Sequence, residues 1–301
     1  MLGVSRARST ALAMVVVVAT TLPAVLAGCG RATPVSPTEV ASTSSEATPD
    51  GASQNSASKN SASPNNASPN SASQGAVGPG GTVLGGSKIV LLDPGHSGGN
   101  AAAPAEINKQ VPDGRQGTKA CNTTGTATDD GFAEHTFAWI VAQQVRQDLE
   151  RTGVTVKMTR DNDTGVGPCV DVRGQLAEEV NADAVVSIHA DGAPPDGHGF
   201  HVAYSSPPLS QSQGEPSVSL ATALRDAMRG AGLPTSTYAG KDGLTPRADL
   251  AGLNFARRPA ALVECDNMRN RDEAVVLRSP AGQARIADAI AGGVLAWLAK
   301  H

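Results

Sequence analysis

Short apolar segments alternate with longer amphipathic ones along residues 87–301, and this alternation constrains the fold more than any other feature of the sequence. Apolar segments with the length of buried strands are Lys88–Leu92, Val154–Met158, Ala184–Ile188, Phe200–Tyr204 and Ala260–Val263. Helical patterns fall between and after them, at Ala133–Arg151, Asp171–Val180, Val218–Gly230 and Gly282–Ala299. Such alternation is typical of α/β proteins, so we predict a single α/β domain with a mostly parallel central sheet flanked by helices on both faces.

Residues 1–28 have the features of a secretory signal peptide. Arg6 and Arg8 precede an apolar run over residues 11–27. The end of this run and the next two residues read LAGC, and the last of them is Cys29. This ending resembles the lipobox of bacterial lipoproteins, in which the cysteine carries the lipid. The alternative is an uncleaved transmembrane anchor, but the run is short for a span and is interrupted by threonine and proline. We therefore expect an exported protein, lipidated at Cys29 and held at the outer face of the cytoplasmic membrane or in the periplasm.

Residues 29–86 consist mostly of Ser, Ala, Asn, Pro, Thr and Gly, without any aromatic residue. Such a composition cannot bury enough apolar surface to offset the entropy lost on ordering. We predict a disordered tether over residues 29–86, and we place the folded domain at residues 87–301.

The charge balance argues against a nucleic-acid partner. The chain carries 28 acidic and 24 basic residues, for a net charge of −4, and two of the arginines lie in the predicted signal peptide. Proteins that bind nucleic acid present an excess of basic residues. We expect no nucleic-acid binding, and we expect the chain to act as a monomer.

Two of the cysteines predict a disulfide. Cys121 and Cys169 both lie in segments rich in Gly, Thr and Pro, which are typical of loops. In an exported protein two loop cysteines favour a disulfide over two free thiols. Cys265 lies at a strand end, and we interpret it as a small buried hydrophobic residue.

Three of the predicted strands lead to a side chain that can bind a metal or move a proton. His96 follows the first strand in LLDPGHSGG, His189 ends the third in SIHAD, and Glu264 ends the last in LVECDN. Ligands of open α/β sheets bind at the carboxyl ends of the strands, so these residues have reason to converge. Glu134 opens the long helix and shares its inward side with Phe137.

Each of these residues also has a plain structural explanation. His96 could cap a turn, His189 could be a hydrogen-bonded core histidine, and Glu134 could be a favourable charge at a helix start. Glu264 could form a surface ion pair with a neighbouring arginine. The spacings match no local zinc signature of the H-E-x-x-H kind, so only the joint placement of the four residues favours a site.

The segments LLDPGHSGG, SIHAD and PAALVECDNMRN, together with the glutamate at the helix start, occur in an order that resembles the peptidoglycan amidase 3 family. These proteins are zinc-dependent N-acetylmuramoyl-L-alanine amidases with an α/β sheet flanked by helices. The resemblance implies one zinc ion per chain, bound by His96, Glu134 and His189, and a catalytic Glu264. It also implies peptidoglycan or muropeptide fragments as substrate, cut between the muramic acid lactyl carbonyl and the L-alanine nitrogen.

The sequence departs from the family pattern in two places. The segment from Ser97 to Phe132 is longer than the Gly-rich link that is usual between the first histidine and the glutamate. After Glu264, Asp266 and Asn267 stand where the family usually has Gly-Phe. The second departure changes the residues of the turn that follows Glu264.

Other polar residues are weaker candidates. Arg160, Arg173 and Arg247 could bind a carboxylate of the substrate, although structural ion pairs would explain the first two equally well. Asp93 could orient a ligand histidine or simply form an Asp-Pro-Gly turn. We expect His135 to lie off the site, and we rank His198 and His201 below the four main candidates.

Two other classes of function are compatible with the residues alone. A different zinc peptidase, such as a carboxypeptidase acting on stem peptides, could use the same ligands, because the ligands do not determine which bond is cut. A catalytically silent wall-binding module is the second alternative, although such a module would be expected to have lost the late glutamate.

Overall fold

The computed structural model describes residues 87–301. The predicted signal peptide, the predicted tether and Cys29 lie outside the described residues. The strands are β1 Ile89–Pro94, β2 Gln110–Pro112, β3 Thr118–Ala120, β4 Thr155–Met158, β5 Ala184–Asp191, β6 His201–Ser205, β7 Leu244–Arg247 and β8 Ala260–Asn267. The α-helices are α1 Pro104–Ile107, α2 Glu134–Arg151, α3 Val170–Glu179, α4 Glu215–Gly230, α5 Ala251–Phe255, α6 Arg271–Arg278 and α7 Pro280–Leu298.

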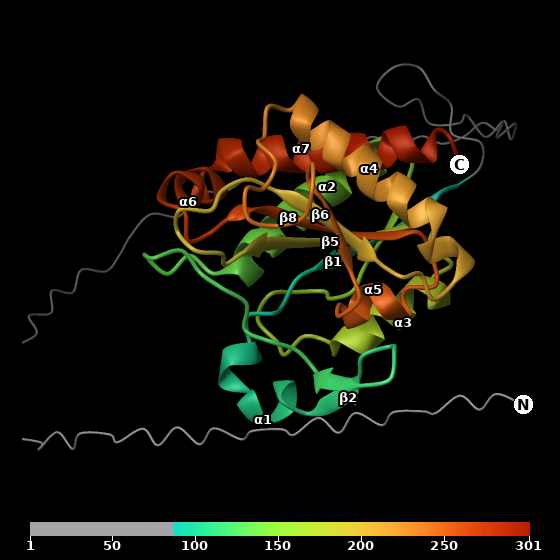
Figure 1. Cartoon of the computed structure of the whole chain (residues 1–301), viewed down its shortest axis with the longest axis horizontal. Helices are drawn as coiled ribbons and strands as arrows, with labels where there is room; N and C mark the ends of the chain where they lie inside the picture. Colours follow the sequence, from blue (N-terminus) through green and yellow to red (C-terminus); the bar gives the residue numbers. More distant parts are fainter. Residues whose placement is uncertain (1–86) are drawn as a thin grey trace, which may run out of the picture. The chain divides into compact units, whose positions relative to one another are not determined.

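Six strands form one sheet in the order β4-β1-β5-β8-β6-β7. Figure 1 labels four of them, β1, β5, β8 and β6. Strands β4, β1, β5 and β8 run parallel to one another, whereas β6 is antiparallel to β8 and parallel to β7. The prediction of a mostly parallel α/β sheet is confirmed. The antiparallel step at β6 brings His201 opposite Glu264 in register.

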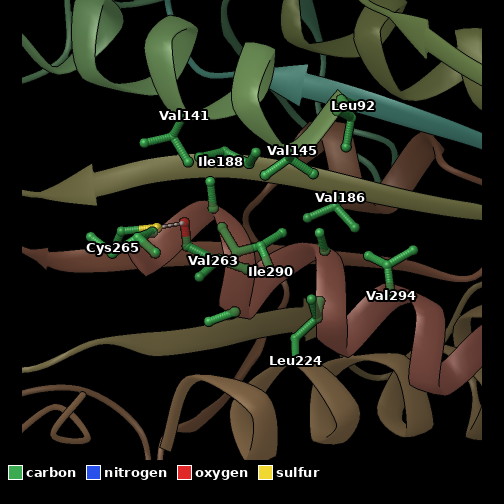
Figure 2. Packing of buried hydrophobic residues seen from close by; sticks show 14 of the residues in the cluster. Leu92, Val141, Val145, Val186, Ile188, Leu224, Val263, Cys265, Ile290 and Val294 are labelled. Carbon is green, nitrogen blue, oxygen red and sulfur yellow. Dashed lines mark hydrogen bonds between the residues drawn. The ribbon is translucent and has the colours of Figure 1, made fainter. Parts of the chain in front are cut away.

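Helices cover both faces of the sheet, as predicted. Helices α2, α4 and α7 lie on one face, where side chains such as Val141, Leu224 and Ile290 contact Val186 and Val263 of the sheet (Figure 2). Helices α3 and α5 cover the opposite face around a smaller apolar cluster (Figure 1). Burial of both faces explains why β1, β5 and β8 each begin with a run of mostly apolar residues.

The alternation of side chains along β5 and β8 decides which residues face which layer. Val186 and Ile188 belong to the cluster under α2 and α7, while Val185 belongs to the cluster under α3 and α5. Because successive side chains point to opposite faces, His189 lies on the same side as Val185. The same alternation puts Glu264 on the side of Leu262, which belongs to the smaller cluster.

The structure contains elements that the sequence patterns did not predict. The segment from Gly240 to Arg247, for which no strand was predicted, ends in strand β7 at the sheet edge. The β2–β3 hairpin and helices α1, α5 and α6 were also not predicted. Strands β5 and β8 continue to Asp191 and Asn267, beyond the predicted ends. Among residues 87–301, no helix combines the length and apolar character needed to cross a membrane.

Candidate metal centre and active site

His96, Glu134 and His189 lie together at the carboxyl end of the sheet. One nitrogen of each histidine and one oxygen of the glutamate all lie within 4.8 Å of one another. Glu134 Oε1 is 3.1 Å from His96 Nε2 and 2.8 Å from His189 Nδ1. Burial opposes ionisation of Glu134, but hydrogen bonds from the rings of His189 and His96 outweigh it and lower the pKa of the carboxyl group. The three side chains thus form a group of metal-binding type, in which Glu134 is buried and the two histidines are partly exposed.

The protein backbone orients two of these side chains. His96 Nδ1 lies 3.1 Å from the carbonyl oxygen of Thr123, which can only accept a hydrogen bond. Thr123 Oγ1 also lies 3.1 Å from Nδ1, so Thr123 holds this edge of the ring while Nε2 faces Glu134. The backbone N–H of Thr126 donates to Glu134 Oε2 at 2.9 Å, which leaves Oε1 facing the histidines. Such outer contacts are the usual way in which metal ligands are held in position.

Two glycines leave room for the cluster. A Cβ atom at Gly95 would overlap the ring of His189. Gly125 has a φ of +76°, and a Cβ there would lie 2.6 Å from Glu134 Oε2 and 2.8 Å from His96 Cδ2. Both positions therefore require the absence of a side chain, and Gly125 also requires the left-handed backbone that glycine adopts most easily.

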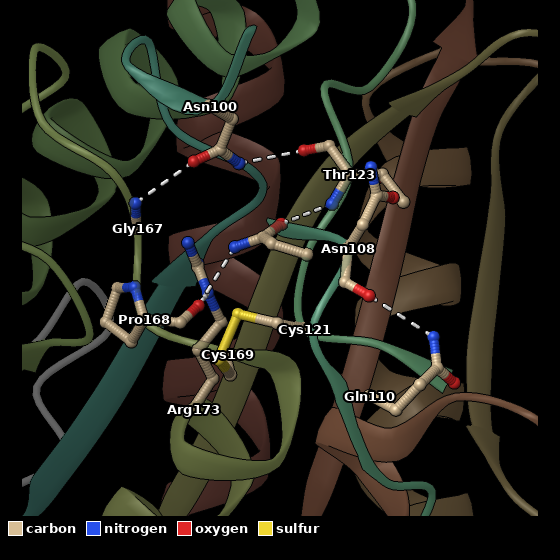
Figure 3. Close-up of a disulfide and its surroundings, with 10 residues drawn as sticks. Asn100, Asn108, Gln110, Cys121, Thr123, Gly167, Pro168, Cys169 and Arg173 are labelled. Carbon is tan, nitrogen blue, oxygen red and sulfur yellow. Dashed lines mark hydrogen bonds between the residues drawn. A yellow bond between two sulfur atoms is a disulfide. The ribbon is translucent and has the colours of Figure 1, made fainter. Parts of the chain in front are cut away.

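The long segment between His96 and Glu134 is tied to the start of α3. Cys121 and Cys169 form a disulfide across 48 residues of sequence (Figure 3). Beside it, Asn122 Nδ2 donates to the carbonyl of Pro168 at 2.9 Å. Asn100 Nδ2 donates to the carbonyl of Thr123 at 2.8 Å, the same oxygen that contacts His96. The disulfide and these hydrogen bonds hold the loop that orients the first histidine.

Glu264 lies beside this cluster. It is the register partner of His189 on β5 and of His201 on β6. Its Oε2 atom is buried and has no hydrogen-bond partner. Burial, followed by the charges of Glu134 and Asp191, raises the pKa of Glu264 well above its usual value, and Arg247 opposes this effect. A carboxyl group with a raised pKa that is unengaged by the protein is suited to carry a proton.

The structure corrects the substrate role considered for Arg160 and Arg173. Both side chains are buried and directed at protein atoms. Arg173 donates to Asp93 Oδ1 at 2.7 Å and to the carbonyl of His96 at 2.6 Å. Arg160 donates to Asp163 Oδ1 at 2.9 Å. These guanidinium groups support the turn that carries His96, so structural ion pairs are the better explanation.

Asp93 is not the partner of a ligand histidine. Burial opposes its ionisation, but Arg173 and hydrogen bonds from Thr159 and Ser187 lower its pKa to about 2. It therefore stays charged as the other half of a buried ion pair.

The remaining weaker candidates occupy different surroundings. Arg247 pairs with Asp249 at 2.7 Å and stays partly exposed near Glu264. His135 Nδ1 lies 2.8 Å from Asp163, whereas His198 is exposed. Cys265 is fully buried in the larger apolar cluster, as predicted.

We call the group of His96, Glu134 and His189 the metal-type cluster. An apolar cavity of about 200 Å³ adjoins it and lies between the sheet and the helices α3 and α5. Its walls include Val185 and Leu262 from the sheet and Val170 and Leu253 from the helices, and His96 and His189 also line it. A concave apolar space next to a few convergent polar groups is the usual form of a small-molecule site.

Sequence reasoning missed the contacts that surround the main residues. Asp191 lies in the SIHAD segment, but the sequence alone indicates no role for it. Its carboxylate oxygen Oδ2 lies 3.3 Å from His201 Nε2, and His201 Nδ1 lies 3.1 Å from Thr245 Oγ1. Only the pairing of β6 with both β8 and β7 brings these residues together, and no local pattern indicates it.

Two imidazoles and a carboxylate gathered at the carboxyl end of an α/β sheet, with a further buried glutamate beside them, resemble the active sites of metal-dependent hydrolases. Comparison with known proteins identifies the family. The family model described as N-acetylmuramoyl-L-alanine amidase matches residues 90–296. The chain belongs to this family.

Individual relatives agree with this assignment. An N-acetylmuramoyl-L-alanine amidase of Mycobacterium tuberculosis is 46% identical over 213 residues, which cover 71% of this chain and 87% of that protein. The crystal structure of an amidase from Mycobacterium smegmatis superposes with a TM-score of 0.69 at 50% identity, covering 71% of this chain and 98% of that one. An amidase of Nostoc punctiforme superposes with a TM-score of 0.53 at 28% identity, covering 71% of this chain and 99% of its own.

Proposed function

We propose that this chain is a zinc-dependent N-acetylmuramoyl-L-alanine amidase that cuts peptidoglycan or muropeptide fragments between N-acetylmuramic acid and the L-alanine of the stem peptide. The observation that carries the proposal is the convergence of His96, Glu134 and His189 within 4.8 Å. Glu264 lies next to them in register with His189. Membership of the amidase family supports the reaction, and the geometry supports the roles of the individual residues.

The donor set fits zinc. Two imidazole nitrogens and one carboxylate oxygen are a common protein ligand set of catalytic zinc, which keeps a further position open. His96 and Glu134 have their outer atoms engaged by the backbone, and their inner atoms, His96 Nε2 and Glu134 Oε1, are the ones that would bind a cation. We assign one zinc ion per chain to His96, Glu134 and His189. When bound, the ion would act as a Lewis acid toward the scissile carbonyl and lower the pKa of water to about 7.

Glu264 is assigned the proton transfer. Hydrolysis adds the oxygen of water to the lactyl carbonyl carbon and breaks the bond from that carbon to the alanine nitrogen. The Glu264 carboxylate takes a proton from the attacking water and passes it to the nitrogen that leaves. A group that first takes and then gives a proton works best with a pKa near the working pH, and burial shifts the pKa of Glu264 upward from its usual value.

Mass spectrometry of digested muropeptides tests the reaction. An amidase releases an intact stem peptide whose first residue is L-alanine with a free amino group. A carboxypeptidase would instead shorten the stem from its other end, and a silent wall-binding module would leave the muropeptide unchanged. The Glu264→Gln variant is the matched control, since it keeps the size of the side chain and should yield no free stem peptide.

We also propose that the chain acts in the cell envelope, as a monomer anchored through a lipid on Cys29. The support is the apolar run and LAGC ending in the sequence, together with the location of peptidoglycan outside the cytoplasm. Two acyl chains give stable membrane attachment, whereas one is marginal. The Cys29→Ala variant should leave the membrane fraction or keep its signal peptide, and light scattering of the lipid-free chain should give the mass of one copy. Wild-type partitioning and migration of the variant would contradict the anchor.

A further inference from the structure

A second polar group, outside the metal-type cluster, lies next to Glu264. His201 is on β6, directly opposite Glu264 on β8. Its ring is held at both nitrogens, with Nε2 3.3 Å from Asp191 Oδ2 and Nδ1 3.1 Å from Thr245 Oγ1. A carboxylate can only accept, so the proton resides on Nε2, and Nδ1 accepts from the Thr245 hydroxyl group. The histidine is thereby fixed in one orientation toward Asp191.

Asp191 differs from the groups around it in being open to solvent. Its side chain is 36% exposed, whereas that of His201 is 2% exposed. The backbone N–H of Gly192 donates to Asp191 Oδ1 at 2.7 Å, so both carboxylate oxygens are oriented. Asp191 is also close enough to Glu264 to contribute to the raised pKa of that group. A fixed, solvent-facing negative charge therefore lies beside the proton carrier.

The proposed reaction creates a positive charge on the peptide that leaves. Before cleavage, the alanine nitrogen is a neutral amide N–H. After the carbon–nitrogen bond breaks and Glu264 delivers one proton, the nitrogen is a primary amine. An α-amino group has a pKa of about 7.7–8.0, so the amine takes a second proton from solvent near neutral pH and becomes an ammonium group.

We propose that Asp191, positioned by His201, binds the amino group that the cleavage releases. This inference rests on the proposed amidase function. The ligand is a peptide with a free amino-terminal L-alanine, recognised by a charge-assisted hydrogen bond between its ammonium group and the Asp191 carboxylate. Asp191 thus belongs to the leaving-group side of the site, and His201 is a positioning residue that acts through it.

Calorimetric titration of the full zinc-loaded chain with two product peptides tests this inference. One is the stem peptide with a free L-alanine amino group, and the other is the same peptide acetylated at that group. We expect the free-amine peptide to bind about tenfold or more tightly, since a hydrogen bond to a charged group contributes that much. In Asp191→Asn this preference should disappear, while the affinity for the acetylated peptide stays the same. The exposed Asp196→Asn variant is the control and should behave like wild type.

His201 provides the second arm of the test. Gln in place of His201 can still donate a hydrogen bond to Asp191, so His201→Gln should keep most of the preference. Ala cannot donate, so His201→Ala should lose much of it. This pair of variants also tests the inference if Asp191→Asn fails to fold. If the contact between His201 and Asp191 only stabilised the fold, its loss would not change the ratio of affinities for the two peptides.

The inference would be overturned if folded Asp191→Asn still bound the free-amine peptide more tightly than the acetylated one. The amino group would then be bound by the metal-type cluster and not by Asp191. Equal binding of both peptides by the wild-type chain would also overturn it. Muropeptide digestion in parallel separates these results from a failure of the proposed function. If wild-type chain releases stem peptide but shows no preference, only the amine site is wrong. If it releases none, the amidase assignment is wrong.

Discussion

Asp266 is a buried carboxyl group in a backbone conformation that few residues adopt, and its replacement should stabilise the protein in a pH-dependent way. The residue is 3% exposed and has a φ of +71°. Its Oδ1 atom has no hydrogen-bond partner. Burial first, and the charge of Glu273 second, raise the pKa of Asp266 to about 7, against an opposing effect of Arg285.

The sign of the effect follows from this raised pKa. Between the unfolded value of 3.8 and the folded value of about 7, the folded chain binds the Asp266 proton more tightly than the unfolded chain does. Stability is therefore lost as the pH rises through this window, and the loss is complete above it. A shift of about three pKa units corresponds to about 4 kcal/mol, which we take as a ceiling.

Asp266→Asn removes the charge, keeps the shape and tolerates the left-handed backbone. We expect its melting temperature to exceed that of wild type by about 5–10 °C more at about pH 8 than at about pH 4.5, since 1 kcal/mol corresponds to about 2–4 °C in a domain of this size. Asp266→Gly should gain at least as much, because glycine adopts a positive φ without strain.

Differential scanning calorimetry with a chelator present checks this prediction, because the chelator removes any contribution of bound metal at each pH. The exposed Asp161→Asn variant serves as the control and should show no such pH dependence. A gain of equal size at both pH values would refute the reasoning, since it would mean that Asp266 is not a buried titrating group.

Three further predictions concern the structures that support the site. Alkylation without reductant should leave Cys121 and Cys169 unmodified, and Cys121→Ser with Cys169→Ser should lower the free energy of unfolding by on the order of 4 kcal/mol; labelling of both wild-type thiols would contradict the disulfide. Gly95→Ala should reduce zinc stoichiometry, because the new methyl group displaces the His189 ring, and full zinc occupancy would contradict that contact. Arg173→Met leaves a buried carboxylate without its cation, so chemical denaturation should show a loss of about 3–5 kcal/mol, and an unchanged midpoint would contradict the buried ion pair.

Much of the fold and of the main site could be predicted because the signals are local. Apolar runs of strand length and helical stripes identify elements, and the carboxyl ends of parallel strands necessarily meet at one edge of a sheet. His96 and His189 follow directly from this rule, and the structure places them with Glu134 in one cluster. Glu134 could be placed only because it shares the inward side of its helix with residues such as Phe137.

The missed parts depend on contacts between distant segments. Strand β7 contains Pro246 and little apolar sequence, so it resembles a loop until its pairing with β6 is known. The role of Arg173 could not be predicted from sequence. The residues around it would be the same whether it bound a substrate carboxylate or Asp93. The Asp191–His201 contact requires the antiparallel placement of β6 beside β8, which the sequence does not indicate.

The central claim is that His96, Glu134 and His189 bind the zinc ion while Glu264 carries the proton. It is tested most directly by measuring both zinc stoichiometry and turnover in single variants. His96→Ala removes a ligand, so zinc content and turnover should fall together. Glu264→Ala removes only the proton carrier, so zinc should stay near one per chain while turnover drops by about 10²–10⁴. Loss of zinc from Glu264→Ala would make Glu264 a ligand, and unchanged zinc and turnover in that variant would contradict the proposed reaction.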